Sequence, residues 1–182
     1  MQFALNLLAG SHLLAGELAS AALMIEEDRL IAEVTGNRPV AYGEMMLATW
    51  RGREAQAGEL IEATVREATA RGLGGLVNLA TYASAVLCNG LGRHDAARDS
   101  AWRVFEHDQL GYGPFVVPEL AEAASRTGDV ALVRAAFEWL SERTRVTPTE
   151  WALGVEARVR STSCSTRSRR GSRRDTQRPR RR

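Results

Sequence analysis

Four glycines recur along this chain at nearly equal intervals, and this repeat constrains the fold more than any other feature. They are Gly16, Gly52, Gly92 and Gly128, spaced 36, 40 and 36 residues apart. Each is followed five residues later by a small or β-branched apolar residue. Such a period is typical of helix-turn-helix repeats such as tetratricopeptide units, which repeat about every 34 residues. The repeat therefore predicts an α-solenoid built from antiparallel helix pairs.

Apolar residues on both sides of these glycines follow the helical period. Before Gly128 the stripe consists of Val117, Leu120, Ala121 and Ala124, and after it of Val130, Val133, Phe137 and Leu140. Spacings of three and four residues place such side chains on one helix face. Each repeat glycine is then expected to end a first helix with a left-handed turn, before a second helix begins. Because no alternating stretch is long enough for a strand, the sequence predicts an all-α fold.

The predicted repeat region covers residues 1–160 and amounts to about four and a half helix pairs. It opens inside a first helix and closes after the segment 151–159, a fifth first helix that has no second helix behind it. Solenoids require polar terminal repeats, because each repeat buries a face against the next. We therefore expect the polypeptide to be a fragment of a longer array.

Residues 161–182 differ in composition from the rest of the chain. They contain nine arginines, one acidic residue (Asp175) and no aliphatic or aromatic side chain, so their net charge is about +8. Such a segment cannot bury enough apolar surface to offset the loss of backbone entropy, and the sequence predicts that it is disordered. Two explanations stay open: an arm that binds nucleic acid, or GC-rich DNA translated in a shifted frame. We favour the shifted frame, because the segment interrupts a helix pair.

Charge, cysteine content and the lack of long apolar runs argue against a secreted, disulfide-bonded or membrane-spanning protein. All 24 basic residues are arginines, and residues 1–160 carry 15 of them against 21 acidic residues, so the predicted repeat region is mildly acidic. Two cysteines, Cys88 and Cys164, cannot form a disulfide framework. Neither a signal peptide nor an apolar run of about 18 residues is present. A cytoplasmic protein with no membrane association is expected.

Three stretches resemble one protein family. They are Leu91-Gly-Arg-His-Asp-Ala-Ala97, Leu120-Ala-Glu-Ala-Ala-Ser-Arg-Thr-Gly-Asp129 and Trp151-Ala-Leu-Gly-Val-Glu-Ala-Arg158. Together they are similar to the tetratricopeptide-like helical region of the large ATP-dependent LuxR-type (MalT-like) transcriptional regulators. The resemblance covers about residues 1 to 160, and its most specific part is the pair of stretches that begin at Leu120 and Trp151.

The resemblance implies a function in transcriptional regulation. Members of this family combine an N-terminal P-loop ATPase, a helical array and a C-terminal DNA-binding helix-turn-helix, and this chain matches only the array. It is then a sensing or protein-interaction segment that binds a partner protein or a small effector on the concave repeat surface. DNA would be bound by a domain that this chain lacks. The alternative is a nucleic-acid-binding protein that acts weakly through its arginine-rich tail.

The sequence offers no catalytic, cofactor or metal site, and we expect the chain not to be an enzyme. A phosphate-binding Gly-x-x-x-x-Gly-Lys-[Ser/Thr] loop is impossible without lysine, and Leu73-Gly-Gly-Leu76 is interpreted as a turn between helices. His12, His94 and His107 lack the spacing of metal ligands, and His94 is expected to be solvated. The adjacent Ser11 and His12 have no acid placed to orient the imidazole, so they do not predict a nucleophile.

An acidic run, a cysteine and the four tryptophans are each expected to serve the structure of the helices. The acidic run Glu26-Glu27-Asp28 could hold a cation but is interpreted as a solvated helix face. Cys88 is expected to be a small core residue. The four tryptophans, Trp50, Trp102, Trp139 and Trp151, are expected to pack between neighbouring helices, although an exposed one could contact a partner.

Overall fold

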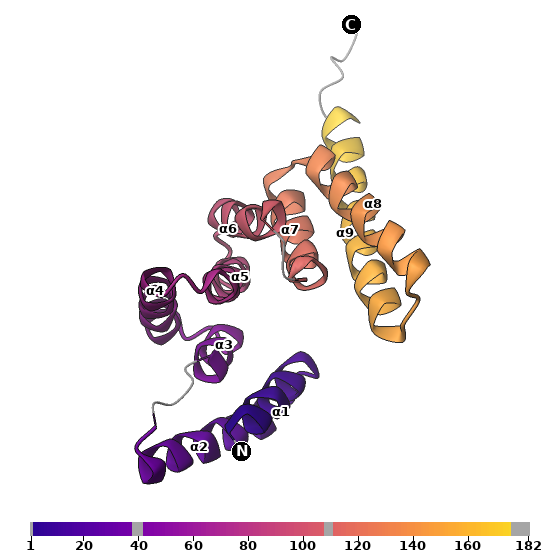
Figure 1. The fold of residues 1–182 in the computed structure, drawn as a ribbon. Coiled ribbons are helices and arrows are strands. Elements are labelled where there is room, and N and C mark those ends of the chain that lie inside the picture. The colour runs from indigo at the N-terminus through magenta and orange to yellow at the C-terminus, as the bar shows by residue number, and fades with distance from the viewer. Residues whose placement is uncertain (1, 38–41, 108–110, 176–182) are drawn as a thin grey trace, which may run out of the picture. The chain divides into compact units, whose positions relative to one another are not determined.

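The structure is a computed structural model that describes residues 2–37, 42–107 and 111–175, with side chains throughout these ranges except at positions 3 and 163–175. The described residues form helices joined by short turns and contain no strand, which confirms the predicted all-α fold (Figure 1). The helices are α1 (Gln2–Leu14), α2 (Leu18–Thr35), α3 (Tyr42–Trp50), α4 (Glu54–Ala70), α5 (Gly74–Gly90), α6 (His94–Glu106), α7 (Gly113–Thr127), α8 (Val130–Val146) and α9 (Glu150–Asp175).

All four repeat glycines lie in the turns between the first and second helices of the predicted pairs. Each has a positive φ, between 74° and 83° at Gly16, Gly92 and Gly128 and 65° at Gly52. At Gly128, the amide of Asp129 donates to the carbonyl of Ala124 (2.8 Å), and the Gly128 amide donates to Ser125 (3.3 Å). This pair of hydrogen bonds forms a Schellman motif, which requires the left-handed conformation that glycine adopts without a steric penalty. The predicted helix-turn-helix pairs are therefore present.

The small residue five positions after each glycine is buried. Ala21, Ala57 and Ala97 are completely inaccessible to solvent, and Val133 nearly so. Ala21, Ala57 and Val133 each lie near the start of a second helix (α2, α4 or α8) that contacts its first helix, and a short side chain there lets the two helices approach closely. In these three pairs, the glycine thus sets the turn and the small residue five positions later sets the packing.

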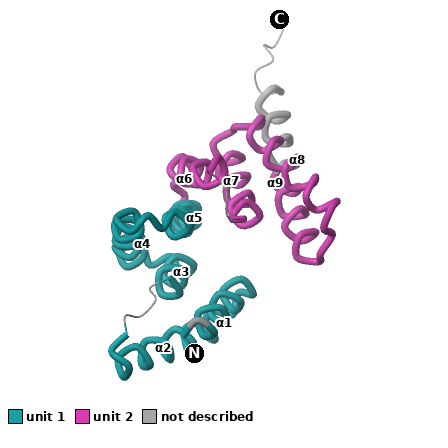
Figure 2. Tube along the Cα trace, in the orientation of Figure 1, with its two compact units in different colours: residues 1–91 teal, residues 92–182 magenta. Residues whose placement is uncertain are grey.

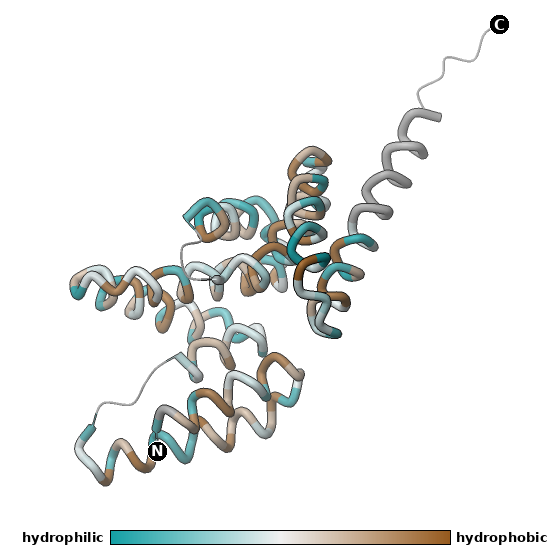
Figure 3. Tube along the Cα trace, turned by 45° about the vertical axis from the view of Figure 1, so that its right-hand side comes forward, coloured by the Kyte–Doolittle hydropathy of each residue, from teal (hydrophilic) through white to brown (hydrophobic). Residues whose placement is uncertain are grey.

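The chain divides into two compact units, residues 1–91 and 92–182 (Figure 2). The first unit contains α1 to α5, and its first helices pack on one another: α3 contacts both α1 and α5. Leu13, Ala21 and Leu47 form one part of its core, between α1, α2 and α3. Hydrophobic and hydrophilic residues alternate along these helices, as expected of amphipathic helices that bury one face (Figure 3).

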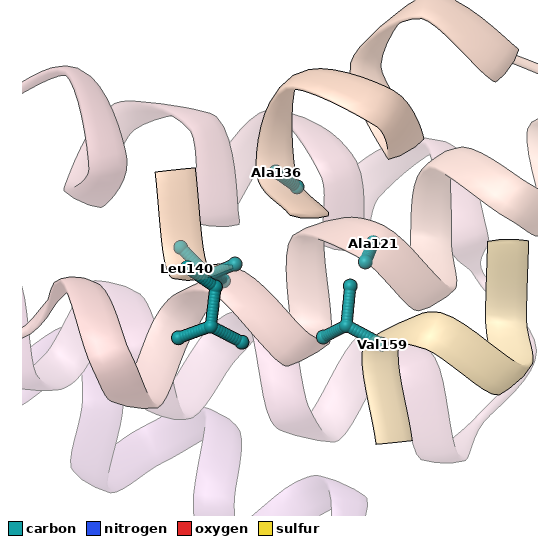
Figure 4. Packing of buried hydrophobic residues seen from close by; sticks show 5 residues of the cluster. Ala121, Ala136, Leu140 and Val159 are labelled. Carbon is teal, nitrogen blue, oxygen red and sulfur yellow. The ribbon is translucent and has the colours of Figure 1, made fainter. Parts of the chain in front are cut away.

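The second unit contains α6 to α9, with α7 at its centre in contact with the other three helices. Its core consists of Val117 and Ala121 from α7, Ala136 and Leu140 from α8, and Val159 from α9 (Figure 4). The contact between α7 and α9 repeats the packing of successive first helices seen in the first unit. Such nearest-neighbour packing is the organising rule of helical-repeat proteins.

The helix α9 continues beyond Ser161, where the sequence predicted the ordered region to end. The hydroxyl groups of Ser161 and Thr162 donate to the carbonyl of Arg158, at 2.7 and 3.1 Å. The side chains of residues 163–175 and all of residues 176–182 lie outside the described part of the chain. Of the tail that the sequence predicts to be disordered, residues 176–182 therefore fall outside the described part of the chain.

Within the described residues, no helix has the length and apolar character that crossing a membrane requires.

Candidate small-molecule pocket

A pocket with a cavity volume of about 510 Å³ opens on the first unit. Its lining residues are Asn6, Leu7, Gly10 and Leu13 of α1, Tyr42, Gly43 and Met46 of α3, and Leu79 of α5. All three helices are first helices of their pairs, so the pocket lies on the face that these helices form by packing side by side. Its volume is in the range of small-molecule sites, which are about 300–1,000 Å³ and mostly apolar.

Asn6 is the one amide side chain of this lining, and hydrogen bonds fix its orientation. Its Nδ2 donates to the backbone carbonyl of Gln2 (3.0 Å) and to Oδ2 of Asp28 on α2 (3.2 Å). Asp28 is only 4% exposed, and its other oxygen, Oδ1, has no hydrogen-bond partner among the described residues. A polar side chain of the pocket is thus anchored by a buried carboxylate behind it.

Gly43 lets α3 approach α2 beside the pocket. A Cβ atom built on Gly43 would lie 2.9 Å from Cγ1 of Ile25 on α2 and 3.7 Å from Oδ1 of Asn6. The first of these distances is shorter than van der Waals contact allows, so any larger residue would displace Ile25. The absence of a side chain at Gly43 therefore keeps space open next to the amide of Asn6.

The interpretation of Glu26-Glu27-Asp28 as a solvated face is correct for the two glutamates and wrong for Asp28. Glu26 is exposed and accepts hydrogen bonds from Arg29, which lower the pKa of the Glu26 carboxyl. Asp28 lies instead on the buried face of α2, with Ala21 and Ala32. The spacing of seven and four residues between these three positions is a helical signal that places Asp28 inward.

His12 does have an acid beside it, contrary to the expectation from the sequence. Its Nδ1 lies 2.6 Å from Oε2 of Glu17, across the turn at Gly16. Both side chains are at least partly exposed. The hydroxyl of Ser11 donates to the carbonyl of Leu7 (3.0 Å), and no hydrogen bond joins it to the imidazole among the described residues. The arrangement links the two ends of a turn and does not form a nucleophile–base pair.

Neither the remaining histidines nor the cysteine is among the residues that line the pocket. His94 begins α6 and is partly buried, so it is less solvated than predicted. The Nδ1 of His107 lies 3.0 Å from the carbonyl of Arg103. Cys88 is a free cysteine of intermediate burial, not a fully buried core residue. In the part of the chain that is described, no three His, Cys, Asp or Glu side chains come together in a way that could hold a metal ion.

The expectation that the tryptophans form part of the core is wrong for three of them. Trp50, Trp102 and Trp151 are exposed, and only Trp139 packs partly buried against the core of the second unit. Aromatic neighbours nevertheless support two of them: the ring centroids of Trp102 and Phe105 are 5.7 Å apart, and those of Trp151 and Phe115 are 5.2 Å apart. These two tryptophans thus each contact another aromatic ring while a large part of the side chain stays exposed.

The two stretches that carry the most specific resemblance pack together in the second unit. Nη2 of Arg158, at the end of the stretch that begins at Trp151, lies 3.0 Å from Oε1 of Glu119 and 3.2 Å from Oε2 of Glu122 on α7. Burial alone would lower the pKa of Arg158, but the charge of Glu119 and the hydrogen bonds to both glutamates outweigh it and raise the pKa. These residues join α9 to α7, which is a structural role. No family model, no curated protein and no solved structure matches this chain.

Proposed function

We propose that this chain is a sensing segment of a LuxR-type transcriptional regulator and that it binds a small effector in the Asn6 pocket. The observation that carries the proposal is the pocket itself, about 510 Å³ in volume and lined entirely by the first helices α1, α3 and α5. Leu7, Leu13, Met46 and Leu79 make most of its wall apolar, and Asn6 supplies a polar group of fixed direction. This combination is typical of sites that bind small organic molecules.

A binding site on three successive helices gives a physical route to regulation. A ligand that touches α1, α3 and α5 at once favours whichever packing of these helices closes around it. It shifts the population of a regulator between two states by the difference in its affinity for them. In the full regulator, such a shift would pass through the array to the ATPase and DNA-binding domains that the family resemblance implies.

Two experiments test this function. Sequencing the DNA around the coding region is expected to reveal a P-loop ATPase upstream and a helix-turn-helix domain downstream, in the same or another reading frame. In an intact regulator that contains this segment, deleting the segment is expected to change the response to inducer while ATP binding is retained. An unchanged response would refute the sensing function.

The second candidate function is nucleic-acid binding by residues 161–182, which their net charge of about +8 favours. Contacts to phosphates would make affinity fall steeply with salt and leave it insensitive to base sequence. Titration of duplex DNA with residues 1–162 and with the full chain, at two salt concentrations, separates the two functions. Equal and negligible binding by both would eliminate the nucleic-acid function.

A further inference from the structure

The direction of the Asn6 amide determines which hydrogen-bonding group faces the pocket. Nδ2 of Asn6 donates to the backbone carbonyl of Gln2, which can only accept a hydrogen bond, and to Oδ2 of Asp28. The amide nitrogen must therefore face Gln2 and Asp28, and the oxygen Oδ1 faces the other way. That direction leads toward Gly43, because a Cβ there would lie 3.7 Å from Oδ1. Asn6 and Gly43 both line the pocket.

Oδ1 of Asn6 is consequently an acceptor without a donor among the described residues. The side chain of Asn6 makes two hydrogen bonds to described residues, and both involve Nδ2. If the amide rotated to offer its nitrogen to a ligand, the buried carboxylate of Asp28 would lose its hydrogen-bond donor, which is unfavourable. The pocket thus presents a fixed acceptor on a mostly apolar wall.

The charge behind this wall restricts the ligand further. Asp28 is 4% exposed and belongs to a helix whose nearest arginine, Arg29, is paired with Glu26 and Glu33 on the outer face. The Oδ1 of Asp28 has no described partner, so no cation of the described chain neutralises this carboxylate. Its negative charge opposes an anionic ligand group beside Asn6 and favours a neutral or cationic one.

We infer that the Asn6 pocket binds an apolar molecule that carries one hydrogen-bond donor, a hydroxyl or an amine, and places that donor on Oδ1 of Asn6. A ligand of the same length that ends in a carboxylate is rejected. Its carboxylate would place a second acceptor and a negative charge next to Oδ1 of Asn6, which is itself an acceptor and lies beside Asp28. This inference rests on the proposed function, since it takes the pocket to be the effector site, and it adds the chemical class of the effector.

Four eight-carbon probes test the inference on the full chain by isothermal titration calorimetry. They are 1-octanol, octylamine, sodium octanoate and 1-methoxyheptane, an isomer of octanol that has no donor. Octanol and octylamine are expected to bind, the ether about tenfold more weakly for lack of the hydrogen bond, and octanoate more weakly still. Equal affinities for octanol, ether and octanoate would overturn the inference while leaving pocket binding in place. If none of the four binds up to its solubility limit, both the inference and the effector site proposed above are refuted.

Two variants assign the preference to Asn6 and Asp28. Asn6→Leu removes the acceptor and is expected to abolish the difference between octanol and the ether. Asp28→Asn keeps the shape but removes the charge, so octanoate should gain affinity relative to octanol. A preference for octanol that survives Asn6→Leu in a folded protein would overturn the assignment to Asn6.

A glycine pair covers the case in which Asn6→Leu fails to fold. Gly43→Ala places a methyl group 3.7 Å from Oδ1 of Asn6 and also displaces Ile25, so its fold is first checked by circular dichroism. In the folded variant, octanol affinity is expected to fall to that of the ether. Gly58→Ala on α4, where an added Cβ meets no atom within 4 Å, is the control and should leave every affinity unchanged. If both substitutions have the same effect on octanol binding, the donor does not lie on Asn6.

Discussion

At the scale of single residues, Arg158 and Arg126 form a natural comparison. Both side chains are 49% exposed, and both face Glu122, which is 34% exposed. Arg158 alone also binds Glu119, whose side chain is 5% exposed. Removing Arg158 takes a cation away from a buried carboxylate, whereas removing Arg126 disturbs only a surface pair.

We therefore expect Arg158→Ala to lower the free energy of unfolding by about 1–3 kcal/mol, and Arg126→Ala by less than about 1 kcal/mol. Urea denaturation followed by circular dichroism measures both. Adding Glu119→Gln to Arg158→Ala should recover part of the loss, because the remaining buried group is then uncharged. Equal effects of the two arginine substitutions would show that burial of Glu119 does not govern this contact.

Glycine behaves differently at two positions that offer the same space. Neither Gly128, in a repeat turn, nor Gly154, in α9, has any atom within 4 Å of an added Cβ, but only Gly128 has a positive φ, of 83°. We expect Gly128→Ala to destabilise by about 1–2 kcal/mol through backbone strain. Gly154→Ala should stabilise by about 0.5–1 kcal/mol, because alanine favours the helix. Thermal melting measures both, and a change of the same sign at both positions would contradict the role given to the repeat glycines.

At the scale of helices, α8 carries one buried and one exposed apolar residue. Truncating each of them distinguishes the loss of core packing from the loss of an apolar side chain alone. Leu140 packs between Ala121, Ala136 and Val159, whereas Val146 is 83% exposed at the end of the helix (Figure 4). Leu140→Ala is expected to cost about 2–5 kcal/mol, and Val146→Ala no more than about 0.5 kcal/mol. Chemical denaturation of the two variants tests this, and a small cost at Leu140 would show that the cluster is not the core of the second unit.

The helix pairs could be predicted from the sequence because their signals are local. A glycine and a small residue five positions later encode a turn and a close contact within one pair, and both are observed at Gly16 and Ala21. The pocket could not be predicted, because its wall combines Asn6 and Leu79, which belong to different pairs. The inward position of Asp28 is hidden in the sequence by its charged neighbours Glu26 and Glu27, although the helical period separates it from them.

At the scale of the whole molecule, residues 161–182 contain no aliphatic or aromatic side chain that could dock on the helices. A chain that ends at residue 162 is therefore expected to melt within about 2 °C of the full chain, as measured by differential scanning calorimetry. A clearly lower melting temperature of the shortened chain would show that this segment stabilises the array, and would argue against its being a frame-shifted addition.

We expect a small molecule to bind to the first helices of the first unit. Hydrogen exchange measured by mass spectrometry on the full chain, with and without saturating 1-octanol, tests it most directly. A ligand that binds only the folded state slows amide exchange most where it holds helices together. The account predicts slower exchange in α1 and α3, with α6 and α8 of the second unit unchanged. Unchanged exchange in α1 and α3, or equal slowing in both units, would contradict it.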